Sequence, residues 1–325
     1  MNDMDAYRDV FAGLTPWSGQ VPQGYLVDFL GTFTDVKFRP LSGLDRSSVG
    51  GDHVATSLPK LGDGSNGEGW FEAVNWISAT REARERFIMM SLGAHYGGQL
   101  VGAQRMLALV NPLPCTLVAV EAEPGNFAWI PEHMRVNGID PLAHWLIPMA
   151  LSDSHEPVLF PVGASGVGSN NCVSTNAANS RDIYARLIIR DGNPDEALRS
   201  LLVDNTTGIT QPVHPGLPYM TEVKVVSAMT LEDLLGPFDC VDFIEADIQQ
   251  SEIVVIPPFI EALRKKVRRV HIGTHGKDVH ATLHRLFADD GWHVVFSFEP
   301  NAQHECALGR FELNDGILTL RNPDL

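Results

Sequence analysis

The sequence predicts an α/β domain in which helices cover both faces of a mostly parallel, doubly wound sheet. Seven short apolar runs begin at residues 87, 115, 145, 241, 267, 292 and 317. Helical segments lie between several of these runs, which is typical of parallel strands joined by crossovers. The last two runs are separated by a short polar segment and are most simply antiparallel. We therefore expect a Rossmann-like sheet of seven strands in which the last strand is reversed.

The first 68 residues differ from the rest of the chain. Turn-forming stretches such as TPWSGQVPQG and KLGDGSNGEG surround one strand-like stretch, FLGTFTDVKF. From Gly69 the pattern is regular, and GWFEAVNWISATREARERF predicts a helix. Its apolar positions share one helix face: Trp70, Ala73, Val74 and Ile77. We expect an N-terminal cap, residues 1–68, and an α/β domain, residues 69–325, interrupted at about 159–219 by a Gly-, Ser- and Asn-rich inserted loop or lid.

Composition limits the partners and the location of the protein. The chain carries 24 Lys and Arg against 40 Asp and Glu, a formal charge of −16. This acidic balance argues against binding to nucleic acid or to anionic membranes, which both require a basic surface. The four cysteines lie far apart and form no CxxC pair, so we expect neither a disulfide framework nor a zinc knuckle. The acidic start does not resemble a signal peptide, and a cytoplasmic protein is expected.

A glycine-containing turn follows the first apolar run, in FIMMSLGAHYGGQLVGAQRMLALV. Glycines such as Gly93 and Gly97 at a strand–helix turn allow a ligand to approach the backbone closely, and a helix N-terminus favours negative charge. The next strand, TLVAVEAEP, ends at Glu121, where a carboxylate can accept hydrogen bonds from both hydroxyls of a ribose. Together these features predict the nucleoside-binding half of a doubly wound sheet. The alternative is a packing turn followed by a surface carboxylate.

The third run leads into Ser152 and Asp153, in IPMALSDSHEP. Acceptor groups at this strand end could bind the exocyclic amine of an adenine. The two residues could equally form an N-cap for the segment that follows. Both interpretations stay open at this stage.

The fourth run, in CVDFIEADIQQSEIVVI, ends in a group of polar side chains: Glu245, Asp247, Gln249 and Glu252. Open α/β sheets place their sites at the carboxyl ends of such strands. Alternation along the strand puts the first three of these side chains on one face. Asp247 could act as a base or bind a metal ion, and Glu252 could complement the dipole of the next helix.

Four histidines follow in VRRVHIGTHGKDVHATLHRLF. His280 and His284 are one helical turn apart but lack the intervening Glu of an HExxH motif, so we expect solvated helix histidines. His275 ends the strand that follows the strand of Asp247, and a histidine beside a carboxylate suits proton transfer. Asp247, His271 and His275 are the candidate ligands for a divalent metal ion, for which no metal-binding motif is present.

These segments, in this order, resemble the FkbM family of S-adenosylmethionine-dependent O-methyltransferases from about Gly69 to the C-terminus. The similar pieces are WFEAVNWISATREARERF before SLGAHYGG, then VEAEPGNFAWIPEHMRVNGID and VVSAMTLEDLL. EADIQQSE is similar to the D-x-x-G-x-E element of the family, and DGILTLRNP to its closing strand. The resemblance implies the class I methyltransferase fold, a seven-stranded sheet with a reversed last strand.

The resemblance also implies roles for individual residues. The implied cofactor-binding set is Gly93, Ala94, His95, Gly97, Glu121, Ser152 and Asp153. In it, Glu121 would hold the ribose, while Ser152 and Asp153 would lie near the adenine. The expected reaction transfers the sulfonium methyl of S-adenosylmethionine to a hydroxyl of a small molecule, such as a sugar or a polyketide. Asp247 would face the reacting centre, and Asp247 or His275 would take the hydroxyl proton.

Three positions depart from the family pattern. Ser91 stands where the family has an acidic residue, and His95 and Gln250 stand where it has glycine. These departures leave a second hypothesis open, a methyltransferase fold kept as a non-catalytic binding or partner module. A third hypothesis is a metal-dependent hydrolase that uses Asp247, His271 and His275. A homo-oligomer is also conceivable, since the aromatic N-terminal segment could cover a neighbouring copy.

Overall fold

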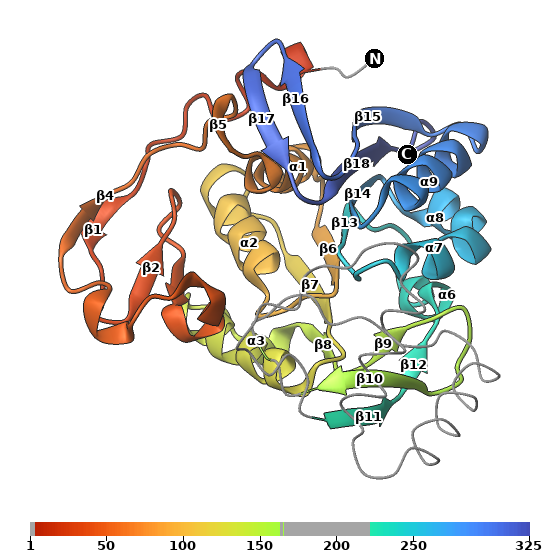
Figure 1. Ribbon diagram of the computed structural model, residues 1–325, viewed down its shortest axis with the longest axis horizontal. Helices are drawn as coiled ribbons and strands as arrows, with labels where there is room; N and C mark the ends of the chain where they lie inside the picture. Colours follow the sequence, from red (N-terminus) through yellow and green to blue (C-terminus); the bar gives the residue numbers. More distant parts are fainter. Residues whose placement is uncertain (1–3, 163–164, 166–221) are drawn as a thin grey trace.

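The structure is a computed structural model that describes residues 4–162, 165 and 222–325 (Figure 1). The predicted insertion at about 159–219 falls almost wholly outside the described residues. The fold is therefore described from the segments on either side of it. No helix in this described part of the chain is both long and apolar enough to cross a membrane.

Each of the seven apolar runs supplies one strand of a seven-stranded sheet. The strands are β6 (Phe87–Leu92), β7 (Cys115–Val120), β8 (Trp145–Ile147), β13 (Phe243–Ala246), β14 (Arg269–Thr274), β15 (His293–Phe298) and β18 (Gly316–Arg321). Their order is β15-β18-β14-β13-β6-β7-β8. β18 is antiparallel to both β14 and β15, and the other neighbouring strands are parallel. This confirms the predicted Rossmann-like sheet with a reversed last strand, which is the class I methyltransferase fold.

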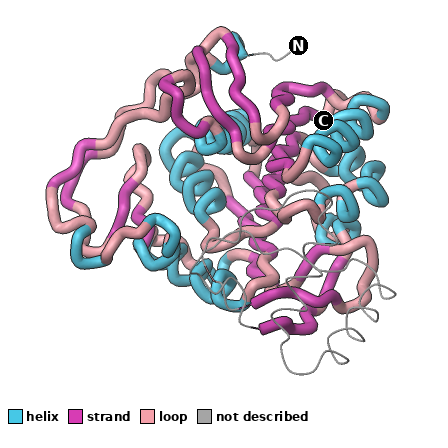
Figure 2. The backbone as a smooth tube through the Cα atoms, viewed as in Figure 1, coloured by secondary structure: helices cyan, strands magenta, loops and turns pink. Residues whose placement is uncertain are grey.

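Helices cover both faces of this sheet (Figures 1 and 2). One face carries α1 (Glu68–Glu82), α2 (Gly98–Val110) and α3 (Pro124–Val136). The other carries α6 (Leu231–Leu235), α7 (Glu252–Val255), α8 (Ile260–Lys266) and α9 (Lys277–Asp289). Along β6, Phe87 and Met89 join the core under the first set of helices, whereas Ile88 and Met90 join the core under the second. Burial on both faces explains why the run is apolar throughout rather than alternating.

Helix α1 is shorter than its sequence pattern predicts. The predicted apolar face is buried, but the helix ends at Glu82 rather than near Phe87. Ala83 adopts an extended backbone conformation, and Phe87 is the first residue of β6, with its side chain fully buried in the core. The polar stretch between them contains neither Gly nor Pro, so nothing in its composition marked the end of the helix.

The N-terminal segment consists of short strands and 3-10 turns. Its strands are β1 (Ser18–Gln20), β2 (Tyr25–Val27), β3 (Phe33–Asp35), β4 (His53–Ala55) and β5 (Asp63–Asn66). β1 pairs with β4 and β2 with β3, while β5 joins a hairpin from the other end of the chain, β16 (Ala302–Cys306) and β17 (Gly309–Leu313). The side chains of Met4, Phe11 and Leu30 belong to the same core as α1 and α2. This segment therefore packs on the α/β domain as part of one hydrophobic core.

Four small strands lie beyond the carboxyl edge of the large sheet, at the bottom of Figure 1. β9 (Ala150–Leu151) pairs in parallel with β12 (Ala228–Met229), and β10 (Val158–Val162) pairs antiparallel with β11 (Glu222–Val226). These pairings bring together the two ends of the segment that the structure does not describe. β9 follows β8 in the chain, and its residues line the candidate site at the carboxyl edge of the sheet.

Phe71 should be among the side chains that contribute most to stability. It is fully buried, and its ring lies 5.0–5.4 Å from four others, those of Trp70, Phe296, Phe298 and Phe311. We expect Phe71→Ala to lower the free energy of unfolding by about 3–5 kcal/mol, because it leaves a cavity between α1, β15 and β17. The conservative Phe71→Leu should cost less than about 1.5 kcal/mol. Urea denaturation measures both, and a cost below 1 kcal/mol for Phe71→Ala would contradict this packing.

Candidate active site

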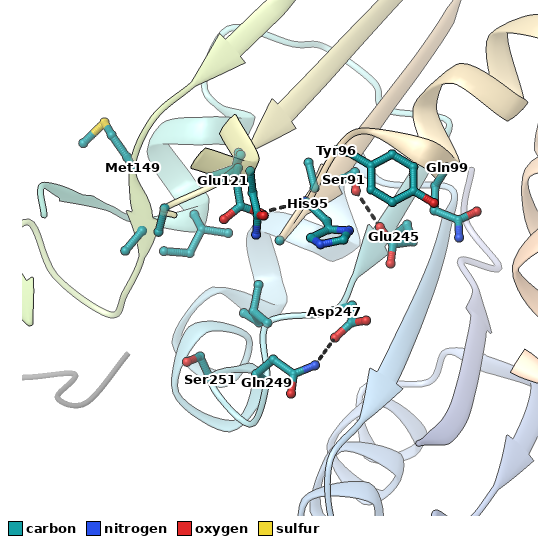
Figure 3. Close-up of a pocket in the computed structure, with 18 of the residues that line it drawn as sticks. Ser91, His95, Tyr96, Gln99, Glu121, Met149, Glu245, Asp247, Gln249 and Ser251 are labelled. Atoms are coloured by element: carbon teal, nitrogen blue, oxygen red, sulfur yellow. Dashed lines mark hydrogen bonds between the residues drawn. The ribbon is translucent and has the colours of Figure 1, made fainter. Parts of the chain in front are cut away.

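A cavity of about 240 Å³ opens at the carboxyl ends of β6, β7 and β13 (Figure 3). The chain builds β6, β7 and β8 in one direction across the sheet and β13, β14 and β15 in the other, so the order reverses between β6 and β13. Open α/β sheets bind ligands in the crevice at such a reversal. The cavity walls come from the turn after β6, the end of β7, strand β9 and the turn after β13.

The turn after β6 has room only for glycine at Gly93. This residue has a φ of +80°, and a Cβ atom there would lie 2.0 Å from the backbone oxygen of Asp247. The N–H groups of Gly93 and Ala94 both donate to the carbonyl of Val120, at 2.9 and 3.0 Å. Gly97, with a φ of +79°, precedes α2. The turn is therefore held against the ends of both neighbouring strands, β7 and β13.

His95 replaces the second glycine of the family pattern without changing the backbone conformation that glycine favours. Its φ is +51°, in the left-handed region, which costs a non-glycine residue about 1–2 kcal/mol. Its N–H donates to Glu121 Oε2 at 2.7 Å, and its ring lines the cavity next to Tyr96. Gln250, at the other departure from glycine, has a φ of +75°. Both departures thus keep the backbone shape and add a side chain.

The N-terminal segment supports this turn through Phe38, which the sequence patterns did not single out. Phe38 is fully buried and stacks on Tyr96, with ring centroids 5.5 Å apart. Tyr96 lines the cavity, and its carbonyl oxygen lies 3.1 Å from the ring nitrogen Nδ1 of His133. Burial lowers the pKa of His133 to about 4, so this ring is neutral. The loop that lines the cavity is thereby fixed from behind by aromatic packing.

Glu121 lies where the sequence predicts it, at the end of β7 and on the wall of the cavity. Its side chain is buried, with Oε1 accepting from the N–H of Glu123 at 2.8 Å and Oε2 accepting from that of His95. Burial raises the pKa of Glu121 to about 7, against the lowering effect of these hydrogen bonds. The two carboxylate oxygens together have about four lone-pair sites, so the group can still accept from a ligand hydroxyl.

Ser152 and Asp153 do not line the cavity. Strand β8 ends at Ile147, before Pro148, and the chain then forms β9, where the N–H of Ser152 donates to the carbonyl of Met229 at 3.0 Å. Asp153 is exposed and accepts from the hydroxyl of Ser152. The wall at this point is formed by Met149, Ala150 and Leu151. Ser152 and Asp153, which the resemblance placed near an adenine, therefore lie outside the residues that line the cavity, and the lining at this point is apolar.

Ser91 faces a carboxyl group from the neighbouring strand. Ser91 on β6 and Glu245 on β13 are direct partners in the parallel ladder, and the serine hydroxyl donates to Glu245 Oε2 at 2.6 Å (Figure 3). Burial, together with the charges of Asp247 and Glu72, raises the pKa of Glu245 well above its ordinary value. Burial also raises the pKa of Glu72, on α1, to about 7. The acidic residue missing at position 91 is thus matched by a carboxyl group on the adjacent strand.

Asp247 lies in a cluster with Glu252 and His275, which follow β13 and β14. His275 Nε2 lies 3.2 Å from Asp247 Oδ1, and His275 Nδ1 lies 3.2 Å from Glu252 Oε1. Gln249, whose φ is +53°, donates to Asp247 Oδ1 at 3.0 Å (Figure 3). Burial opposes ionisation of both Asp247 and His275, but their mutual attraction and the charge of Glu252 prevail. The pKa of Asp247 is lowered and that of His275 is raised well above its ordinary value.

His271, a predicted metal ligand, lies elsewhere. Its Nδ1 is 3.0 Å from Asn75 Nδ2 and 2.9 Å from Thr319 Oγ1, in a buried polar layer between α1 and the sheet. Burial lowers its pKa to about 4. The predicted set Asp247, His271 and His275 is therefore wrong as a metal site, because His271 lies within β14, four residues before His275, with its side chain in this buried layer.

His280 is not the solvated helix histidine that the spacing predicts. It is 4% exposed, and its two ring nitrogens lie 2.9 Å from Thr274 Oγ1 and 3.0 Å from Ser297 Oγ. His284 is partly exposed, and its ring centroid lies 6.4 Å from that of His280. His280 joins α9 to the ends of β14 and β15, which is a structural role.

Comparison with known proteins gives distant relatives. No protein-family model matches the chain. A protein of Jannaschia sp. (strain CCS1) described as "Putative methyltransferase" is 22% identical over 257 residues, which are 78% of this chain and 80% of that protein. These matches do not confirm the FkbM family.

Two solved structures illustrate the structural similarity. Aeropyrum pernix fibrillarin in complex with natively bound S-adenosyl-L-methionine has a TM-score of 0.35 and 10% identity, over 77% of this chain and 76% of that one. Precorrin-6y C5,15-methyltransferase from Geobacter metallireducens GS-15 has a TM-score of 0.34 and 11% identity, over 77% and 86%. Both TM-scores are low, and the fold of this chain is defined by its own strand order and directions.

Substitution of Gly93 tests the close approach of the two loops. We expect Gly93→Ala to lower the free energy of unfolding by about 2 kcal/mol or more, because the new Cβ would meet the Asp247 carbonyl and φ is positive. Gly69→Ala is the matched control, since Gly69 lies on α1 with nothing near the position of its Cβ. The control should be neutral or slightly stabilising. Equal thermal stability of the two variants would contradict the geometry.

Proposed function

We propose that this protein is an S-adenosylmethionine-dependent methyltransferase that acts on a hydroxyl group of a small molecule. The proposal depends on one observation: the glycine turn, Glu121 and Asp247 line one cavity at the reversal of strand order. The description of the Jannaschia relative supports methyl transfer, and the resemblance to the FkbM family supports a hydroxyl acceptor. The acidic composition argues for a small acceptor rather than a nucleic acid.

The residues present fit such a cofactor. The turn residues Gly93, Ala94 and His95 line the cavity, where the methionine part would bind. Glu121 offers acceptors for the ribose hydroxyls, and Met149 and Leu151 offer an apolar surface for the adenine. The described residues that line the cavity include four acids, Glu72, Glu121, Glu245 and Asp247, and neither Lys nor Arg. This charge suits a cofactor whose sulfonium and ammonium groups are cationic.

Asp247 is the residue that we assign to the reacting centre. When bound, the cofactor supplies an electrophilic methyl group on a cationic sulfonium. Transfer forms a C–O bond to the acceptor, breaks the C–S bond and releases the hydroxyl proton. Gln249 and His275 both contact Asp247 at Oδ1, so we assign that proton to Oδ2. A carboxylate of lowered pKa can take it, because the oxygen becomes strongly acidic as the methyl arrives.

Cofactor binding and turnover separate this function from a non-catalytic module. We expect calorimetry to show that the protein binds S-adenosylmethionine and S-adenosylhomocysteine. Asp247→Asn should keep cofactor binding but reduce methyl transfer about 10²–10⁴-fold, because it removes the proton acceptor. Transfer would be measured as labelled methyl incorporated into a panel of sugars and polyketide alcohols.

The control for this experiment is Asp278→Asn, on the exposed side of α9 and outside the cavity, which should change neither binding nor transfer. No binding at millimolar cofactor would contradict the proposed function. The non-catalytic module would be favoured if the protein binds the cofactor but transfers no methyl group to any acceptor of the panel, and if Asp247→Asn behaves identically.

The pKa of Glu121 predicts how nucleoside affinity depends on pH. Ribose hydroxyls donate to the ionised carboxylate, whereas the free protein holds this carboxyl partly protonated because its pKa is about 7. Affinity for the uncharged probe 5′-methylthioadenosine should therefore rise with pH, by up to tenfold per unit below pH 7, and level off above it. Calorimetry at pH 5.5, 6.5 and 8 measures this dependence.

Glu121→Gln provides the control for the pH experiment. Because the amide does not titrate, this variant should bind 5′-methylthioadenosine more weakly at pH 8 and with little change in affinity between pH 5.5 and 8. A wild-type affinity that is flat over this range would show that Glu121 does not contact the ligand.

A further inference from the structure

We propose that Asp247, Glu252 and His275 form a binding site for one divalent metal ion at the edge of the cavity. The site goes beyond the proposed methyl transfer, and its existence does not depend on that reaction. It differs from the metal site that the sequence suggested, because Glu252 takes the place of His271. Each residue contributes one potential ligand atom, and the three atoms lie within 4.8 Å of one another.

Three separate elements bring these side chains together. Asp247 follows β13, Glu252 is the first residue of α7, and His275 follows β14. β13 and β14 are adjacent parallel strands, so the residues that follow them emerge at the same edge of the sheet. The ligands are two carboxylates and one imidazole, a mixed oxygen and nitrogen set that suits Mn²⁺, Fe²⁺, Co²⁺ or Zn²⁺ better than Ca²⁺ or Mg²⁺.

The burial of Glu252 with one unpaired carboxylate oxygen is the observation that points to a ligand. Its side chain is 0% exposed, yet its Oε2 has no hydrogen-bond partner among the described residues. Oε1 accepts from the N–H of Ile248 at 2.9 Å. Burial of a carboxylate oxygen without a partner is costly, since the oxygen loses its hydration and gains nothing in return. A metal ion in the cluster would satisfy it.

The contact between Glu252 and His275 supports the same conclusion. Their atoms Oε1 and Nδ1 are 3.2 Å apart, but Nδ1 makes no hydrogen bond of acceptable geometry within the described structure. One atom of each group, Glu252 Oε2 and His275 Nδ1, therefore lacks a hydrogen-bond partner although the two side chains lie close together. An ion bound to Glu252 and to one ring nitrogen of His275 would give such an atom a partner.

The charge of the cluster is also unbalanced without a cation. Asp315, just before β18, places its Oδ1 3.6 Å from His275 Nε2, so a single histidine faces three carboxylates. Among the ion pairs of the described residues, these three carboxylates pair only with His275. Even a protonated imidazole offers one positive charge against three negative ones. A divalent ion would offset the remaining charge and leave the histidine neutral, as a metal ligand must be.

The position of the cluster allows exchange with the cavity. Asp247 has a 41% exposed side chain and lines the cavity, whereas Glu252 and His275 lie behind it. An ion held by all three would have an open side toward the cavity, where an acceptor oxygen or water can bind. Protonated His275 holding the carboxylates without metal is the competing state, and it is an outcome of the test.

Manganese binding to the full-length protein tests this site. The purified, chelator-treated chain is titrated with MnCl₂ without cofactor, and free Mn²⁺ is measured by electron paramagnetic resonance. We expect one saturable site per chain, with a thermal unfolding midpoint that rises with Mn²⁺ concentration. Glu252→Gln and His275→Asn should each weaken binding at least about tenfold. Glu72→Gln, which removes another cavity carboxyl outside the three ligands, should bind Mn²⁺ like the wild type.

Absence of a saturable site, or equal binding by the wild type and both ligand variants, would overturn the proposal and favour the protonated histidine. Circular dichroism establishes that each variant is folded; if Glu252→Gln is not, His275→Asn and Asp247→Asn decide. Zn²⁺ should compete with Mn²⁺ for the same site and bind more tightly. Mn²⁺ binding without cofactor binding would retain the site and reject the proposed methyl transfer, whereas the reverse result would reject the site alone.

Discussion

The candidate site depends on one close contact, between Gly93 and the backbone carbonyl of Asp247. The loops that follow β6 and β13 pass each other with no space for a Cβ atom at Gly93. The N–H of Asp247 donates to the carbonyl of Leu92 at 2.9 Å, which extends the ladder between the two strands into these loops. Because of this contact, a glycine turn suited to a nucleoside cofactor and the carboxylate of Asp247 share one cavity.

A second consequence is that negative charge is concentrated where these loops meet. Parallel strands carry their residues to the same edge, so Glu245 lies directly beside Ser91 and Asp247 projects just beyond them. Burial raises the pKa values of Glu72 and Glu245, so these two carboxyl groups carry less negative charge than exposed ones would. A carboxyl group from the next strand, that of Glu245, thus lies beside Ser91 at the cavity.

The sequence was informative where the pattern of apolar residues alone determines a strand and the position of its end. The seven apolar runs form seven strands because each run is buried on both faces of the sheet. Glu121 and Asp247 lie at the cavity because the parallel strands that precede them end at the same edge. The sequence was misleading for side chains whose hydrogen-bond partners lie on other elements of the fold. His271 turns under α1 to meet Asn75, and His280 meets Ser297, since both contacts involve segments distant in the chain. Nothing near either histidine could reveal those partners.

Backbone strain connects the departures from the family pattern to the chemistry of the site. His95, Gln249 and Gln250 all have positive φ and lie in the two loops at the cavity, at a cost of about 1–2 kcal/mol each. Such strain persists only where surrounding contacts hold it. Those contacts end on site carboxylates: the N–H of His95 donates to Glu121, and the side chain of Gln249 donates to Asp247. The shape of the two loops is thus coupled to the carboxylates of Glu121 and Asp247, because two of these strained residues each donate a hydrogen bond to one of them.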